Sequence, residues 1–121
     1  MKEIMKPIFH PPLDAITLEG IFHALSDPVR AAIFADIAFS ACAQNCTVFS
    51  QIIDRTIPKS TLSQHFKALR EAGLIRSERC GVEMHNVSRA AEIEERFPGL
   101  IVSILTAYKK QMQEKAAAPV S

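Results

Sequence analysis

A polar run near the middle of the chain carries the side chains with the clearest chemistry. From Lys59 onward, serine, threonine, glutamine, histidine, lysine and arginine are interleaved with Leu62, Phe66 and Leu69. At about 100° per residue these three apolar side chains share one narrow helix face, and most of the polar ones point elsewhere. Gln64 can pair with the N6/N7 edge of adenine, while lysine and arginine can reach guanine or phosphate. The pattern is typical of a helix that reads the major groove of DNA.

Positive charge is concentrated in the same region, although the net charge of the whole chain is only +1. Between Arg55 and Val82 there are six basic and two acidic side chains, a local excess of four positive charges. Such an excess attracts phosphates in a salt-dependent way. We therefore expect double-stranded DNA as a partner. The expected DNA-binding residues are Lys59, Ser60, Thr61, Ser63, Gln64, His65, Lys67, Arg70, Arg76 and Arg79.

The cysteines are the second group with chemical potential. Cys42 and Cys46, four residues apart, could chelate a soft ion or form a disulfide, since thiolates suit soft metals. A free cysteine is also among the most commonly buried residues, so a packing role stays open beside the redox and metal roles. No cofactor is required, and a soft metal ion is the one candidate. Cys80 is separated from this pair by the polar helix, and the sequence assigns it no role.

Catalysis would need a nucleophile and a base brought together in a pocket. Cys46 and His65 are the only plausible partners, and nothing in their spacing positions them. We therefore expect no enzyme. His65 falls between the faces of its helix, where it could touch a phosphate or fill an internal corner.

Two helices are expected ahead of this region. Apolar side chains recur at helical spacing over residues 17–25, with Thr17 as a possible N-cap. Asp27-Pro28 then supplies a capping side chain and a proline at the first helical position, where its missing N–H costs nothing. The apolar stripe of this second helix consists of Val29, Ile33 and Ile37.

The next two helices form a helix-turn-helix. Thr47 can cap a short third helix, which Pro58 limits because residues before proline avoid the α region. Ser60 begins the fourth helix, and Gly73 stands where a left-handed C-terminal cap is usual. Residues 74–88 then predict a β-hairpin wing.

Gly81 is expected at the tip of this hairpin. Ser88 can cap a helix through Arg96, and Pro98 can start the last one. The fold class is therefore mainly α with a small β-hairpin wing, a winged helix-turn-helix. The expected divisions are an N-terminal arm at 1–14, the winged domain with terminal dimerisation helices at 15–113, and a flexible tail at 114–121.

Length and composition fit one domain. The 121 residues are 48% hydrophobic and 22% charged, which is ordinary for a folded protein. The Pro-rich start lacks the apolar segment of a secretory signal, and the longest uncharged stretch, Ile37 to Ile53, holds polar groups that lipid could not satisfy. We expect a cytoplasmic protein with free thiols and no membrane contact.

Two runs resemble a known family. Leu25-Ser26-Asp27-Pro28-Val29-Arg30 and Ser60-Thr61-Leu62-Ser63-Gln64-His65-Phe66-Lys67-Ala68-Leu69-Arg70-Glu71-Ala72-Gly73-Leu74-Ile75 are similar to the ArsR/SmtB family of bacterial winged helix-turn-helix regulators. The resemblance implies a homodimeric repressor whose fourth helix enters the major groove and whose wing follows the DNA backbone. It also implies a dimer interface on the first and last helices, at Leu18, Ile21, Phe22, Ile101, Leu105 and Tyr108.

Three alternatives stay open beside the resemblance. A buried core within one chain would produce the same apolar stripes, and we expect a mixture of core and interface. Metal-sensing relatives often carry a tight cysteine pair at the third helix, of which Cys46-Thr47-Val48 retains at most one member. A winged helix can also serve as a protein–protein interaction module without DNA binding, because a fold does not fix a function.

Overall fold

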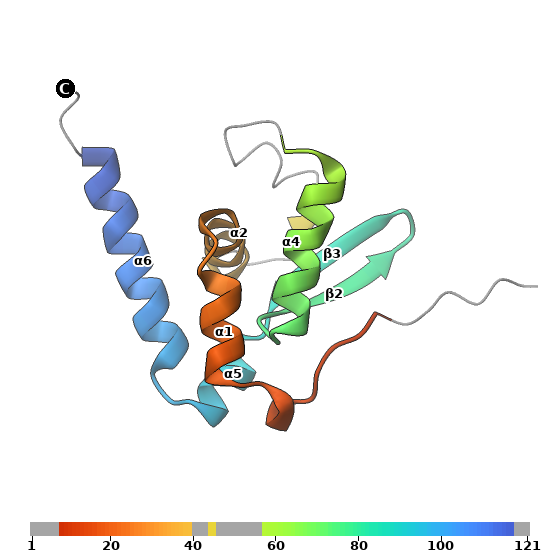
Figure 1. Cartoon of the computed structure of the whole chain (residues 1–121), viewed down its shortest axis with the longest axis horizontal. Coiled ribbons are helices and arrows are strands. Elements are labelled where there is room, and N and C mark those ends of the chain that lie inside the picture. The colour runs from red at the N-terminus through yellow and green to blue at the C-terminus, as the bar shows by residue number, and fades with distance from the viewer. Residues whose placement is uncertain (1–7, 40–43, 46–56, 118–121) are drawn as a thin grey trace, which may run out of the picture.

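The computed structural model describes residues 8–39, 44–45 and 57–117. Its helices are α1 (Leu18–Leu25), α2 (Pro28–Phe39), α4 (Lys59–Glu71), α5 (Ala90–Arg96) and α6 (Leu100–Ala117), preceded by the 3-10 turn η1 (Leu13–Ala15). Its strands are β1 (Gln44–Asn45), β2 (Ile75–Cys80) and β3 (Glu83–Ser88) (Figure 1). The helix predicted to begin at Thr47 lies outside the described residues. The order confirms a mainly helical winged helix-turn-helix.

The first two helices begin where the sequence predicts. The hydroxyl of Thr17 accepts a hydrogen bond from the Gly20 N–H at 3.0 Å, which caps α1. Asp27 Oδ1 accepts from the N–H groups of Val29 and Arg30 at 2.8 and 3.1 Å, which caps α2 behind the proline. The guanidinium of Arg30 also donates to the carbonyl of Ala24 at 2.8 Å. The two helices are therefore fixed to each other at their corner.

One hydrophobic core joins the elements. Leu62, Phe66 and Leu69, the apolar face of α4, are buried together with Ile33 and Phe34 of α2. The same cluster continues into α1, β2, α5 and α6, where its buried members are Ile21, Ala24, Ile75, Ile93 and Ile101. Burial of this continuous apolar surface sets the position of α4, whose polar face is left outside.

Gly73 ends α4 in the way the sequence predicts. Its φ of +86° is a left-handed conformation that favours glycine. A Cβ at this position would overlap the side chain of Ile16, which is buried against the same turn. The Leu74 N–H then donates to the Leu69 carbonyl at 3.0 Å, and the chain turns directly into β2.

The wing is a three-stranded sheet instead of the predicted hairpin alone. β2 and β3 pair antiparallel with Cys80 opposite Glu83, and Gly81 in the turn has a φ of +66°. β1 pairs with the other edge of β3, with Gln44 opposite Asn86, so the strand order is β1-β3-β2. β1 consists of only two polar residues, which is too short a segment to show the alternation of a strand. The strand was therefore not predicted from the sequence.

Three helix boundaries differ from the predicted ones. α4 begins at Lys59, one residue before Ser60, and α5 begins at Ala90 with Arg89 in the N-cap position. The hydroxyl of Ser88 accepts only a long hydrogen bond, 3.4 Å, from the Ala90 N–H. α6 begins at Leu100 and not at Pro98, and it runs to Ala117, into the segment predicted as a tail.

The start of α6 is set by Glu94, which lies on the preceding helix. The Glu94 carboxylate accepts hydrogen bonds from the N–H groups of Gly99, Ile101 and Val102 at 2.8, 2.7 and 3.1 Å. These bonds lower the pKa of Glu94, because they favour its charged form. Sequence rules place a capping residue next to the helix it caps, so they miss one that arrives from α5.

Candidate nucleic-acid interface

The outer face of α4 carries the predicted polar side chains. Six of them are exposed to solvent, while the apolar face of the same helix is buried. Pro58 occupies the N-cap position and offers no side-chain acceptor to the N–H groups of the first turn. The N–H groups at this end of α4 have no side-chain acceptor at the N-cap, so they can face phosphates or base edges. The exposed residues are Lys59, Ser60, Thr61, Ser63, Gln64 and Lys67.

His65 does not share this exposure. Its ring is half-buried, and its Nδ1 is buried without a hydrogen-bond partner in the described part of the chain. Burial acts to raise the pKa of Asp27, but hydrogen bonds from Arg30 and Val29 and the charges of His65 and Arg30 outweigh it and lower the pKa. His65 therefore lies close to the corner between α1 and α2. Of the two roles expected for His65, this placement favours filling the internal corner over contacting a phosphate.

Arg70 connects α4 to the wing. Its guanidinium is half-buried and donates to the hydroxyl of Ser77 on β2 at 3.3 Å. The hydroxyl of Ser77 in turn donates to Asn86 Oδ1 on β3 at 2.5 Å, and both of these residues are buried. The structure thus gives Arg70 a bracing contact between α4 and the hairpin.

The two wing arginines have different surroundings. Arg76 pairs with the Glu92 carboxylate of α5 at 3.4 Å, whereas the Arg79 side chain is exposed near the tip of the hairpin. Glu92 also accepts two hydrogen bonds from the buried Arg89, at 3.1 and 2.9 Å. The Arg89 bond foremost, with Arg76 beside it, lowers the pKa of Glu92 against the opposing effect of burial. Arg79 is therefore the wing arginine that is free to reach a phosphate.

The predicted dimer residues divide into core and surface. Ile21 is 0% exposed and Ile101 is 1% exposed, so the structure places both in the core of a single chain and leaves neither side chain accessible to a second copy. Leu18 and Phe22 remain exposed at 38% and 54%. Val102 at the start of α6 is 60% exposed and was missed, although its apolar neighbours were noted. The expected mixture of core and interface is therefore tested here only for the core, and the interface stays a prediction.

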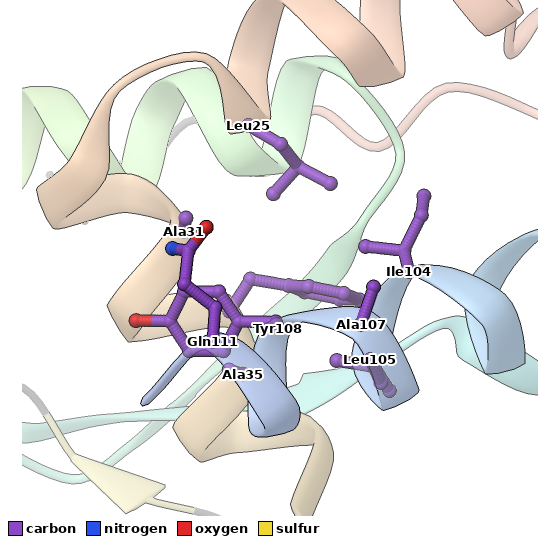
Figure 2. A pocket seen from close by; sticks show the side chains of 9 residues that line it. Leu25, Ala31, Ala35, Ile104, Leu105, Ala107, Tyr108 and Gln111 are labelled. Atoms are coloured by element: carbon purple, nitrogen blue, oxygen red, sulfur yellow. The ribbon is translucent and has the colours of Figure 1, made fainter. Parts of the chain in front are cut away.

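Leu105 and Tyr108 line a hollow between α2 and α6 (Figure 2). The hollow has a volume of about 290 Å³, and apolar side chains make up most of its wall. Burial raises the pKa of Tyr108. The lining residues are Leu25, Ala31, Phe34, Ala35, Ile104, Leu105, Ala107, Tyr108 and Gln111. A row of apolar side chains on α6 therefore faces a hollow that no other side chain of the described residues fills.

The structure gives no support for a metal centre within the described residues, where no cluster of three histidine, cysteine or acidic side chains could hold an ion. The predicted switch cysteines, Cys42 and Cys46, lie outside those residues. Cys80 is an exposed free thiol on β2. In the part of the chain that the structure describes, no helix has the length and hydropathy that a bilayer crossing needs.

Comparison with known proteins agrees with this geometry. Residues 25–78 match a helix-turn-helix domain family. The chain is similar in structure to an ArsR-like transcriptional regulator from Rhodococcus sp. RHA1, with a TM-score of 0.55, 20% identity, and coverage of 85% of this chain and 94% of that one. A second ArsR family transcriptional regulator has a TM-score of 0.54, 19% identity, and coverage of 93% and 100%. No match is found among curated proteins.

Proposed function

Since the chain has the winged helix-turn-helix fold of ArsR-like transcriptional regulators, we propose that it is a sequence-specific DNA-binding regulator of that family. The observation that carries the proposal is the outer face of α4, which is polar and basic along its length while its inner face is buried. A helix of this kind enters the major groove with its N-terminal residues toward the base edges. Gln64 reads bases, and Lys59 and Lys67 hold phosphates.

The wing contributes a second contact. Arg79 near the hairpin tip follows the DNA backbone, where it adds affinity without sequence preference. Arg70 and Ser77 keep the hairpin at a fixed angle to α4, so that both contacts engage one duplex. Arg76, paired with Glu92, contributes less than Arg79.

The regulator acts as a homodimer. Leu18 and Phe22 of α1 and Val102 of α6 expose apolar surface that a second copy would cover. The hollow lined by Leu105 and Tyr108 offers space for apolar side chains of the same partner. Dimerisation places two copies of α4 about one turn of DNA apart. A dimer bound at a promoter in the cytoplasm blocks transcription, and the protein acts as a repressor without catalysis.

DNA binding is tested by fluorescence anisotropy on DNA from upstream of the protein's own gene, over a series of salt concentrations. Gln64→Ala should weaken specific binding by about 1–3 kcal/mol and relax specificity at one position of the site. Gln113→Ala, an exposed glutamine on α6, is the matched control and should bind as the wild type does. Arg79→Ala should weaken binding to all sequences alike and reduce the salt slope by about one.

Two results would contradict the proposal. Wild-type protein that neither binds mixed DNA fragments nor is retained on heparin would favour a protein–protein module. Equal loss of affinity in Gln64→Ala and Gln113→Ala would show that the outer face of α4 is not the recognition surface.

A further inference from the structure

The N-terminal segment before η1 lies against the base of the wing, where the first described residues of the chain run beside β2 (Figure 1). The imidazole Nε2 of His10 accepts a hydrogen bond from the backbone N–H of Ser77 at 3.0 Å. β2 is an edge strand of the described sheet, and Ser77 is buried. Without His10 this N–H would be a buried donor on an open edge. His10 thus supplies the partner that a neighbouring strand would otherwise give.

Two arginines, Arg89 at the N-cap of α5 and Arg96 at its last residue, hold the segment in place. Arg89 is 3% exposed and donates through Nη1 to the carbonyl of Pro11 at 2.8 Å. Arg96 donates to the carbonyls of Leu13 and Ile16 at 2.7 and 2.5 Å. These bonds join positions about eighty residues apart in the sequence. Residues 10–16, which include the end of the predicted arm, are therefore hydrogen-bonded to the rest of the domain.

Ser77 links the arm to α4. Its N–H is held by His10, while its hydroxyl donates to Asn86 and accepts from the Arg70 guanidinium of α4. One residue of β2 therefore touches the arm, the neighbouring strand and α4.

The charges around His10 favour its neutral form. Burial foremost, and then the positive charges of Arg76, Arg89 and Arg70, lower the pKa of His10, with Glu78 opposing them. Glu92 offsets part of this field, since it pairs with Arg76 and Arg89. Protonation at Nε2 would remove the acceptor for the Ser77 N–H and add a cation beside three arginines.

We propose that His10 is a positioning residue for DNA binding, which holds the wing against the arm only while its imidazole is neutral. The proposal rests on the proposed function for its DNA readout. Acidification then detaches the arm from Ser77, loosens the wing relative to α4, and weakens binding. His10 and the arm act on DNA binding through Ser77 and Arg70, and neither of them touches DNA.

The arm contact is tested without DNA by amide hydrogen exchange of Ser77, measured by NMR between pH 7.5 and 5. In the wild type, protection of this N–H should fall as His10 becomes protonated, below the usual histidine pKa of about 6.5. His10→Gln keeps a side-chain acceptor that does not titrate, so its protection should stay constant over this range. His10→Ala should lose protection at every pH. Unchanged Ser77 protection in His10→Ala would overturn the proposal.

The DNA readout uses the same variants at pH 7.5 and 5.5. Loss of one hydrogen bond corresponds to an affinity loss of about two- to tenfold, so wild type should lose this much more than His10→Gln on acidification. His23→Gln, a change at an exposed histidine of α1, is the control and should keep the wild-type pH dependence. Identical pH dependence in wild type and His10→Gln would overturn the positioning role. If no variant binds DNA at all, the proposed function fails, and Ser77 protection alone decides the arm contact.

Discussion

The wing side and the α1–α6 side of this domain differ in the polar groups that they bury. All three buried polar or charged residues of the described chain, Ser77, Asn86 and Arg89, lie at the base of the wing, and each has hydrogen-bond partners. Both sides expose apolar side chains, Val82 and Val87 on the hairpin and Leu18, Phe22 and Val102 on α1 and α6, but among the described residues the α1–α6 side has no buried polar network. A polar network that is satisfied within one chain needs no further partner to be stable. Exposed apolar side chains gain free energy when a partner covers them.

The largest expected effect is on the apolar side. If the protein forms the proposed dimer, Phe22→Lys should convert it to a monomer, because a lysine ammonium would have to be buried without a counter-charge at the proposed interface. Since Phe22 is exposed within one chain, the protomer should remain folded. Light scattering gives the mass, and circular dichroism checks the fold. His23→Lys, on the neighbouring exposed position, should stay dimeric, and a dimeric Phe22→Lys would place the interface elsewhere.

On the wing side the largest effect is expected at Arg89. Arg89→Met would leave the Pro11 carbonyl without its donor and Glu92 without its closest cation, at a cost of about 2–3 kcal/mol in the free energy of unfolding. Urea denaturation of the isolated protein measures this loss. Arg79→Met removes an exposed arginine and should change the free energy by less than about 0.5 kcal/mol. Similar losses in the two variants would show that the buried network contributes nothing specific.

A smaller loss is expected where α4 turns into the wing. Gly73→Ala forces a side chain into a left-handed conformation and against Ile16, so we expect about 1–3 kcal/mol of destabilisation by thermal unfolding. Gly81→Ala has the same kind of backbone at the hairpin tip but meets no atom nearby. Its cost should be the smaller of the two. The reverse order would mean that contact with Ile16 is readily relieved.

The smallest expected effect is at the cap of α2, away from both surfaces. Asp27→Ala should cost about 1 kcal/mol, because two N–H groups lose their acceptor. The pKa of Asp27 is lowered in the folded protein, so its contribution is present above the usual aspartate pKa and is lost as pH falls through the folded value. The difference in unfolding free energy between wild type and variant should therefore shrink in acid. A constant difference from pH 7 to pH 2 would contradict the capping role.

Local signals were read correctly because the physics behind them is local. Thr17, Asp27-Pro28 and Gly73 act within a few residues of the helix ends they set, and their side-chain or backbone chemistry is the same wherever they occur. The spacing of Leu62, Phe66 and Leu69 indicated which face of α4 is buried, and hence which face is exposed to solvent.

Contacts between segments that are distant in the chain could not be predicted from local sequence patterns. Ile21 and Phe22 are adjacent apolar residues of one helix, yet the first is core and the second is surface, and only the packing of α1 separates them. Arg76 and Arg79 are equally basic in sequence, and only the position of Glu92 on α5 pairs one of them.

The sequence by itself determined the starts of α1 and α2, the turn that ends α4, the buried stripe of α4 and the hairpin turn, since each depends on the rotation per residue or the φ angle of a few neighbours. The tertiary structure decided which apolar residues stay uncovered, how α6 is capped by Glu94, and that His10 meets Ser77. These depend on free energies of burial and pairing between segments far apart in the chain, which no local pattern encodes.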